Sequence, residues 1–571
     1  MWSRKPSVPC LWCMIGVATL LFVRVHAELF TAISDVEPLL ETHKKIIDDL
    51  NDYVNKEEER LKLLKKHLDI YKVEHTKAME DIPNYLGNPI NAFTLIKRLT
   101  TDLDYIEESI KKGTDYIKNI TMNHQGVKYP TLEDLTGAAQ ALTRLQDTYH
   151  LKVSDLAAGK LNGVIYRHDE PTILPPKVRE PVSTPMLAGD CYELGRALYN
   201  EKDYKNALSW MMEAHRKFKE ENALYPFTEG DILEYISFSH YLLGDTRAAM
   251  EWTKKLLEVE PKHPRARGNI PHYQKTIAEE DEKLKKKRRG DIGEEEVKTP
   301  PNPQSLPENE RLQYEALCRG EIDIPADVSR RLKCRYLTEN HPFLKLAPIK
   351  MEQMYIKPDI VVFYDVLSEE ESEHIKELAK PRFRRATVHD PKTGELVPAH
   401  YRISKSSWLR DEESPIVARV SQRVADFTGL SLESAEELQV VNYGIGGHYE
   451  PHYDFARKTE HAFGKFSGNR IATVLFYMSD VAQGGATVFT ELGLSVFPVA
   501  RAAAFWLNLH PSGEGDFATR HAACPVLRGS KWVCNKWIHQ GGQELIKPCD
   551  LEYQKEGIAR QIPKPVPKSF R

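Results

Sequence analysis

The sequence predicts a multidomain α + β protein, with helical regions in its first half and a β-rich domain, a sandwich or jelly roll, in its second half. Two observations predict this order. Amphipathic runs with helical periodicity fill the first half, whereas short β-branched and aromatic runs separated by glycine follow Tyr314. A chain of 571 residues is too long for a single core, so we expect several folded units.

Residues 1–27 are typical of a secretory signal peptide, with Arg4 and Lys5 before a long apolar run and the small-residue site "VHA" before Glu28. The alternative is an uncleaved signal anchor, because the apolar run approaches membrane-spanning length. No later segment is apolar enough to span a bilayer, so we expect no membrane span after cleavage. Cleavage changes the formal net charge from −4 to −7, which argues against nucleic-acid binding driven by net charge.

The predicted signal peptide places the mature cysteines in an oxidising compartment, and one glycosylation motif is consistent with this location. Cleavage removes Cys10 and Cys13, so that six of the eight cysteines remain. Some of these should pair, but the sequence alone leaves the pairing open. The tripeptide "NIT" at Asn119 is an acceptor for N-glycosylation.

The first predicted domain, residues 28–165, is helical and contains a heptad repeat from about 40 to 71. Its seam residues follow alternating steps of three and four, which is the signature of a coiled coil. They are Leu40, His43, Ile47, Leu50, Val54, Glu57, Leu61, Leu64, Leu68 and Tyr71. We expect this helix to mediate self-association, with the polar positions fixing its register. The alternative is an ordinary long helix of a bundle.

The second predicted domain, residues 166–275, includes a proline-rich bridge near its start, followed by two segments that resemble tetratricopeptide repeats. Ala207 and Ala249 fall at the position where the two helices of such a repeat cross closely. Helical repeats form grooves for extended peptides, and the many tyrosines here would suit proline-rich ligands, whose polyproline II shape is already formed. Each of these tyrosines could equally belong to the core.

A charged and proline-rich linker is predicted for residues 276–312, a β-rich domain for 313–552 and a tail for 553–571. Many short strands without intervening helices favour a sandwich or jelly roll. Two amphipathic helices, near 368–380 and 415–429, are expected to pack on the outer face of this domain.

One stretch of the β-rich domain, "GGHYEPHYDFA", suggests a metal site. It sets His448, Glu450, His452 and Asp454 at alternate positions, which would point to the same side of a strand. His452 and Asp454 supply two donors, and a second histidine from a distant strand would complete a set of two histidines and one carboxylate. This set leaves positions open on Fe(II) for oxygen and a co-substrate.

Three histidines are candidates for the third ligand. His510 lies in a turn-like stretch, whereas His521 and His539 lie in strand-like sequence. A lone H-x-D motif arises often by chance, and these arguments favour His521 without excluding the other two.

Beyond this motif, a series of stretches resembles one known family. They are "HYEPHYDFA", "GNRIAT", "FYMSDVAQGGATVF", "SGEGD", "TRHAACPVL", "KWVCNKWIH", and, outside the β-rich domain, "NPINAFTLIKRL", "LEDLTGAAQALTRLQDTY", "DCYELGRALYNEKDY" and "YEALCRG". Taken in their order along the chain, these stretches resemble the collagen prolyl 4-hydroxylase alpha subunits over nearly the whole mature chain. The resemblance implies an enzyme of the endoplasmic reticulum with a double-stranded β-helix, or jelly-roll, catalytic domain.

The resemblance implies the following roles. His452, Asp454 and His521 match the iron ligands, Lys531 matches the lysine that pairs with the distal carboxylate of 2-oxoglutarate, and His539 matches a histidine that assists co-substrate binding and decarboxylation. Tyr443 matches a tyrosine of the co-substrate pocket. The implied cofactors are Fe(II) and L-ascorbate, and the implied co-substrates are 2-oxoglutarate and O₂. The implied reaction hydroxylates proline at C4 in X-Pro-Gly sequences and converts 2-oxoglutarate to succinate and CO₂.

The helical unit corresponds to the peptide-substrate-binding domain of this family. Tyr235, Arg265, Asn269 and Tyr273 match its binding residues or lie beside them. The sequence departs from the family pattern at Phe238 and His272, where the family usually has tyrosine, which leaves the peptide preference open.

The resemblance also implies disulfides and partners. Cys318 and Cys334 match one family disulfide and Cys524 and Cys549 match the other, Cys191 is expected to be a free thiol, and the state of Cys534 is left open. The implied partner is protein disulfide isomerase, the beta subunit, in an α₂β₂ tetramer that remains in the lumen of the endoplasmic reticulum.

Two alternative functions use the same sequence features. The first is an inactive scaffold that binds proline-rich chains, and the second is a related dioxygenase that acts on other secreted proline-rich proteins or on lysine. A serine hydrolase or a nucleotide-dependent enzyme has no support, because the sequence contains neither G-x-S-x-G nor a P-loop.

Overall fold

The computed structural model describes residues 33–36, 38–80, 106, 132–161, 185–221, 225–288, 306–389, 396–398, 401–444, 446–457, 463 and 466–549. The predicted signal peptide, the predicted glycosylation site Asn119 and the predicted tail lie outside these residues. The chain forms two compact units, one of residues 34–130 and one of the remaining residues. No helix of the described ranges is both long and apolar enough to cross a membrane.

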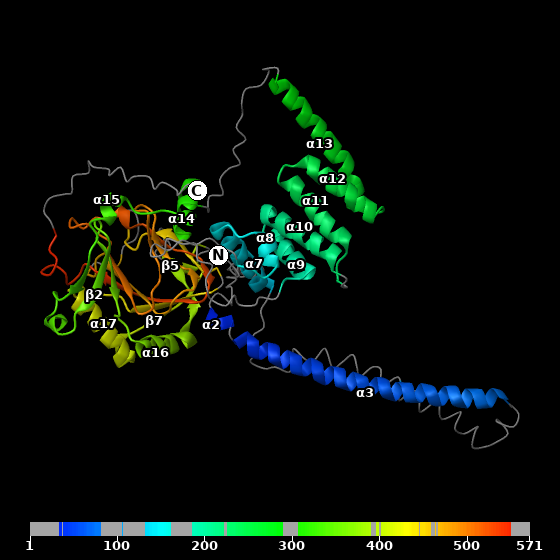
Figure 1. Ribbon diagram of the computed structural model, residues 1–571, viewed down its shortest axis with the longest axis horizontal. Coiled ribbons are helices and arrows are strands. Elements are labelled where there is room, and N and C mark those ends of the chain that lie inside the picture. Colours follow the sequence, from blue (N-terminus) through cyan, green and yellow to red (C-terminus); the bar gives the residue numbers. More distant parts are fainter. Residues whose placement is uncertain are drawn as a thin grey trace, which may run out of the picture. The chain divides into compact units, whose positions relative to one another are not determined.

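The first unit is dominated by one long helix, α3 (Pro38–Glu80), which follows the short helix α2 (Ile33–Val36) (Figure 1). Helix α3 contains the whole predicted heptad seam and has no buried residue. Apolar seam residues such as Leu40 and Leu61 are exposed. The polar seam residue Glu57 pairs with Arg60 of the same helix. The predicted self-association through this seam stays a prediction.

The second unit begins with helices that precede and form the repeat-like region. These are α7 (Leu132–Tyr149), α8 (Val153–Ala157), α9 (Ala188–Asn200), α10 (Tyr204–Glu220), α11 (Glu229–Leu242), α12 (Thr246–Val259) and α13 (Pro264–Arg288), drawn in cyan to green in Figure 1. Each of α9 to α13 packs against its neighbour in the chain. The predicted crossing residues Ala207 and Ala249 are both fully buried.

Capping residues explain where these helices begin. Asp203 and Asp245 stand before α10 and α12 at corresponding positions, and each side chain accepts a hydrogen bond from a backbone N–H of the first turn. Thr228 forms a capping box with Asp231 at the start of α11. Helix α13 continues to Arg288, so the segment predicted as a linker from residue 276 begins as helix.

The rest of the second unit is the β-rich domain. Its helices are α14 (Glu308–Cys318), α15 (Ala326–Ser329), α16 (Glu369–Ala379) and α17 (Pro415–Thr428). Its strands are β1 (Cys334–Leu337), β2 (Ile349–Tyr355), β3 (Ile360–Tyr364), β4 (Arg384–Arg385), β5 (Thr387–His389), β6 (Leu396–Pro398), β7 (Lys405–Leu409), β8 (Leu438–Tyr443), β9 (Tyr449–His452), β10 (Arg470–Tyr477), β11 (Gln483–Gly484), β12 (Thr487–Phe489), β13 (Leu494–Val496), β14 (Ala503–Leu507), β15 (His521–Ala523), β16 (Val526–Arg528) and β17 (Lys531–His539).

These strands form two main antiparallel sheets. The large sheet has nine strands in the order β1-β2-β3-β14-β10-β17-β8-β7-β4, and the small sheet has four in the order β13-β12-β15-β9. Two strand pairs, β11 with β16 and β5 with β6, lie outside them. Crossovers between distant strands are typical of a jelly roll, as predicted.

Alternation of side chains along each strand creates three packed layers. One core lies between the sheets and includes Tyr443, Leu475 and Val533 of the large sheet with Phe489 of the small sheet. The opposite face of the large sheet packs on α16 and α17, which confirms the predicted outer helices. The opposite face of the small sheet, including Val488, packs on α7, α9 and α14.

Candidate active site

The H-x-D motif lies at the end of strand β9, where it meets strand β15. His452 and His521 are paired residues of these antiparallel strands, and their ring centres are 4.4 Å apart. Strand β9 ends at His452, so Asp454 belongs to the bend that follows. The carboxylate of Asp454 lies 3.7 Å from His452 Nε2 and 3.6 Å from His521 Nε2. Donor atoms of all three residues lie within 4.8 Å of one another.

Hydrogen bonds fix which nitrogen of each histidine faces the carboxylate. Nδ1 of His452 lies 2.7 Å from the carbonyl oxygen of Glu450, and Nδ1 of His521 lies 2.9 Å from that of Thr519. A carbonyl can only accept, so each Nδ1 carries the proton and donates it. Each Nε2 lone pair is therefore directed to the space shared with Asp454, which is the arrangement of metal-binding histidines.

A second layer of hydrogen bonds orients the carboxylate. The hydroxyl of Thr473 donates to Asp454 Oδ2 at 2.7 Å, and the side-chain amide of Asn508 donates to that hydroxyl at 2.9 Å. Both residues are buried. Neither residue was predicted from the sequence. Thr473 lies on strand β10 and Asn508 directly follows strand β14, so both are distant from the H-x-D motif in the chain.

Burial sets the protonation of these groups. Burial, together with the neighbouring His521, lowers the pKa of His452 well below its usual value, so its ring is neutral. Burial alone would raise the pKa of Asp454, but His521, His452 and Arg470 outweigh it and bring that pKa to about 2. Two imidazoles and one carboxylate are the donor set that suits Fe(II) with open positions.

A buried lysine lies on the same side of the large sheet. Lys531, at the start of β17, pairs with Tyr443 of β8 and is 1% exposed. Its ammonium lies 5.3 Å from the centre of the Tyr443 ring. Burial lowers the pKa of Lys531 to about 7, and no carboxylate of the described chain is paired with it. Because a buried ammonium without a counter-ion is costly, this residue fits an anionic ligand that enters the space between the sheets.

His539 lies at the other end of β17 and is held by two groups. Its Nδ1 donates to the carbonyl oxygen of Gly468 at 2.8 Å, and its Nε2 lies 2.8 Å from Glu436. Arg470 also donates to Glu436. Burial would raise the pKa of Glu436, but the hydrogen bonds from His539 and Arg470 lower it. Glu436 and Arg470 were not identified from the sequence.

The structure distinguishes between the three histidines that were candidates for the third ligand. His510 lies outside the cluster, with Nε2 3.7 Å from Asp516, and His539 is engaged with Glu436. His448 is buried and lies 4.0 Å from Glu450, away from the donor cluster. Only His521 joins His452 and Asp454 among the described residues.

The predicted disulfide pairing is wrong in the structure. Cys318 is bonded to Cys524, with Cα atoms 5.5 Å apart, and Cys334 and Cys549 are exposed free cysteines. The reason is packing, because α14 lies against β15 and brings residues that are 206 positions apart into one core. Cys191 and Cys534 are free and buried.

The residues predicted to bind the peptide differ in how exposed their side chains are. Tyr235 is half-buried and makes edge contacts with Tyr199 at 4.9 Å and Tyr192 at 5.9 Å. These two tyrosines were not among the predicted binding residues. Arg265 is exposed and pairs with Glu234 at 3.2 Å, and Asn269 is half-buried.

Tyr273 does not fit the peptide-binding position predicted for it. Its side chain is 1% exposed, with its ring 5.1 Å from that of Tyr241, because its position on α13 faces α12 and the core. The exposed neighbour His272 instead hydrogen-bonds the hydroxyl of Tyr241 at 2.9 Å.

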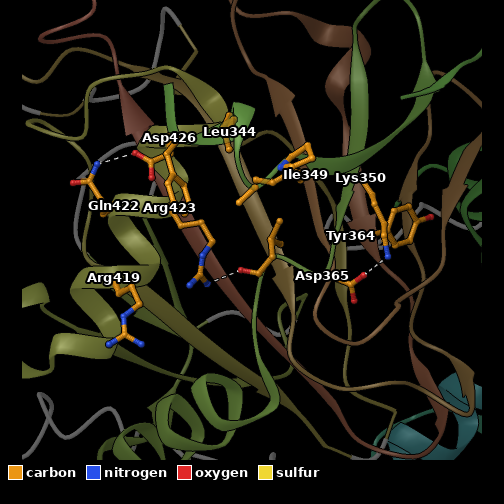
Figure 2. A pocket seen from close by; sticks show the side chains of 13 residues that line it. Leu344, Ile349, Lys350, Tyr364, Asp365, Arg419, Gln422, Arg423 and Asp426 are labelled. Atoms are coloured by element: carbon orange, nitrogen blue, oxygen red, sulfur yellow. Dashed lines mark hydrogen bonds and ion pairs between the residues drawn. The ribbon is translucent and has the colours of Figure 1, made fainter. Parts of the chain in front are cut away.

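A separate pocket of about 480 Å³ lies on the α17 side of the large sheet (Figure 2). It contains none of the predicted site residues. Its charged side chains have polar partners. Figure 2 shows Lys350 with Asp365, whose atoms lie 2.8 Å apart, and the carboxylate of Asp426 with the amide of Gln422, 2.9 Å apart. This pairing distinguishes it from the space beside Lys531.

Comparisons with known proteins match three regions of the chain. Family models match for the prolyl 4-hydroxylase alpha-subunit N-terminal region at residues 32–163, the prolyl 4-hydroxylase peptide-substrate-binding domain at 188–279 and the 2OG-Fe(II) oxygenase superfamily at 438–539. The last range contains every metal and co-substrate residue predicted from the sequence.

Two relatives and one solved structure are similar to the chain. It is 45% identical to prolyl 4-hydroxylase subunit alpha-1 of Gallus gallus over 92% of this chain and 99% of that one. It is 46% identical to subunit alpha-2 of Caenorhabditis elegans over 92% of this chain and 94% of that one. A viral collagen prolyl hydroxylase structure from Paramecium Bursaria Chlorella virus-1 matches 32% of this chain and 95% of its own, at 21% identity and a TM-score of 0.27.

Membership of the oxygenase superfamily specifies Fe(II), 2-oxoglutarate and O₂, and prolyl hydroxylases also use ascorbate. The donor set and the buried lysine of this structure fit these groups. Extensive identity over almost the full length of both chains, together with all three matching regions, shows that the chain belongs to the prolyl 4-hydroxylase alpha-subunit family.

Proposed function

We propose that this chain is the alpha subunit of a procollagen-proline 4-dioxygenase, which hydroxylates C4 of proline in X-Pro-Gly sequences while 2-oxoglutarate is converted to succinate and CO₂. The observation that carries the proposal is the convergence of His452, Asp454 and His521 in a chain of this family.

Fe(II) would be held by His452, Asp454 and His521. The two Nδ1–H donors are already used by backbone carbonyls, which keeps each Nε2 free to bind the metal. Thr473 restrains one oxygen of Asp454 and so favours a fixed orientation of the carboxylate. Bound Fe(II), with 2-oxoglutarate and O₂, supplies the oxidising chemistry that inserts oxygen into the C4–H bond of proline.

Lys531 would bind the distal carboxylate of 2-oxoglutarate. Its ammonium is buried beside Tyr443, and a charge-assisted hydrogen bond there would compensate for its desolvation. Tyr443 would line the same pocket, and His539 would assist co-substrate binding and decarboxylation. Apolar walls from residues such as Phe489 and Trp506 exclude water from the space around His521.

The helical domain would bind the proline-rich substrate chain. Tyr235, with Tyr192 and Tyr199, offers aromatic surface to a polyproline II peptide, and Arg265 and Asn269 offer polar contacts. Collagen-like chains are the substrates that this arrangement favours.

The family resemblance supports the proposed assembly, and the signal-like N-terminal sequence supports the proposed location. Protein disulfide isomerase would be the beta subunit of an α₂β₂ tetramer, the seam of α3 would pair the two alpha chains, and the signal peptide would direct the chain to the lumen of the endoplasmic reticulum. The N-glycosylation acceptor motif at Asn119 is consistent with that compartment.

The experiment is to co-express residues 28–571 with protein disulfide isomerase and supply Fe(II), 2-oxoglutarate, ascorbate and a proline-proline-glycine repeat peptide. Mass spectrometry should detect the gain of one oxygen on proline. The gain should disappear in His452→Ala and persist in His510→Ala, a histidine outside the donor cluster.

A soluble wild-type complex that binds iron and peptide without this gain would contradict the proposal. Such a result would favour another substrate or an inactive scaffold.

A further inference from the structure

Helix α7 is matched by sequence to the N-terminal region, but it packs within the compact unit that contains the oxygenase domain. Its residues Ala139, Leu145 and Tyr149 belong to the same core cluster as Val488 and Ala522 of the small sheet. The helix therefore lies against the sheet that carries the proposed iron ligands.

One contact of α7 reaches the loop before strand β9. Arg144 donates from Nη1 to the carbonyl oxygen of Gly446 at 2.9 Å. Gly446 has a φ of +56°, and a Cβ there would lie only 2.7 Å from the carbonyl oxygen of Ala141. Helix and loop thus touch through their backbones, which requires glycine. The loop leads after two residues into β9, which ends at His452.

A second contact reaches the segment after strand β15. The hydroxyl of Tyr149, fully buried, donates to the carbonyl oxygen of Pro525. That carbonyl also accepts from the N–H of Gly485 at 3.1 Å. Gly484 fits against this point because a Cβ there would lie 2.6 Å from the Tyr149 hydroxyl. Pro525 follows β15, which begins at His521.

The two contacted segments are joined to each other. The N–H of Val526 donates to the carbonyl oxygen of Gly447 at 3.3 Å, beyond the paired part of β9 and β15 that contains His452 and His521. Helix α7 also reaches the helical domain, where Gln140 donates to Glu201 at 3.0 Å. It therefore contacts both the peptide-binding helices and the segments that flank the two strands of the proposed metal centre.

We propose that α7 is a positioning element of the iron site. In this role Arg144 holds the position of the loop that leads to His452, and Tyr149 holds the position of the segment that follows His521. This inference rests on the proposed function, since it concerns the same metal centre. Both residues act through the backbone of the two strands and touch neither metal nor substrate.

The test compares Tyr149→Phe and Arg144→Gln with wild type, each co-expressed with protein disulfide isomerase. Titration with Co(II), followed by its visible absorption, measures metal affinity without turnover. We expect Co(II) to dissociate roughly 3- to 10-fold more readily from each variant, as expected for the loss of one hydrogen bond. Affinity for a proline-proline-glycine repeat peptide should stay unchanged, and Arg144→Lys should recover part of the metal affinity.

Tyr364→Phe is the matched control, since its hydroxyl binds Glu352 on β2, in the large sheet. Unchanged Co(II) affinity in both α7 variants would overturn the inference. If Tyr149→Phe does not fold, Arg144→Gln decides the question. Failure of His452→Ala to abolish Co(II) binding would instead overturn the proposed function, and this inference with it.

Discussion

His452 and His521 face each other as partners in the antiparallel pair of strands β9 and β15. Asp454 lies between their Nε2 atoms, within 3.7 Å of each. Because backbone hydrogen bonds join the two strands, the separation of the two imidazoles is set by the sheet. The donor set is therefore preorganised, and changes that disturb either strand should weaken metal binding.

Thr473→Val should weaken Fe(II) or Co(II) binding by about 10- to 100-fold, because the hydroxyl that orients Asp454 is lost while side-chain shape is kept. Metal titration measures the effect. Thr253→Val is the matched control, since this buried hydroxyl donates within helix α12 to Ala249 at 2.8 Å. Equal metal affinity in the two variants would contradict the role of Thr473.

Lys531→Met should raise the KM for 2-oxoglutarate strongly, since the buried cation for its carboxylate is lost. In the wild type, kcat/KM for 2-oxoglutarate should fall as the pH rises above about 7, because the free lysine then loses its proton. Lys531→Arg, which stays charged, should lack this fall if it still binds the co-substrate. A flat wild-type profile from pH 6 to 9 would argue against a buried lysine with this pKa.

The lowered pKa of Lys531 also predicts how the stability of the folded chain depends on pH. Its pKa in the folded chain, about 7, lies below its ordinary value of 10.5. Between these values the unfolded chain binds the extra proton, so the contribution of Lys531 to the free energy of unfolding should increase with pH. Denaturant unfolding without 2-oxoglutarate at pH 7 and pH 9 should show a smaller pH dependence in Lys531→Met.

Peptide mapping without reduction should yield a cross-linked peptide that contains Cys318 and Cys524. The fragments with Cys334 and Cys549 should react with a thiol reagent in the native protein, because both residues are exposed. Recovery of Cys318 with Cys334, and of Cys524 with Cys549, would instead support the pairing implied by the family resemblance.

Tyr235→Ala should raise the KM for long proline-rich peptides by roughly 2- to 10-fold, because it removes aromatic surface beside Tyr192 and Tyr199. The kcat should change little, since the helical domain is not part of the donor cluster. Tyr273→Phe should leave this KM unchanged, because the Tyr273 side chain is buried. A larger effect from Tyr273→Phe than from Tyr235→Ala would contradict this placement.

Local periodicity made much of the fold predictable. The helix that became α3, the repeat-like helices and the outer helices α16 and α17 all follow from spacings of three and four residues. The strand pattern predicted a sandwich or jelly roll, and the family resemblance implied the jelly roll. The spacing of two residues between His452 and Asp454 indicated a pair of metal ligands. The order of the strands in the sheets was not predictable, since it depends on pairings between distant segments.

The sequence by itself determined the kinds of chemical groups and their local spacing, such as the H-x-D motif, the strand-like sequence that leads to His539 and the crossing alanines Ala207 and Ala249. Only the tertiary structure decided which distant groups meet: it brought His521 and not His510 to Asp454, joined Cys318 to Cys524, and buried Tyr273. The physical reason is that dihedral preferences and side-chain periodicity act over a few residues. Contacts between segments hundreds of residues apart are fixed by how whole sheets and helices pack.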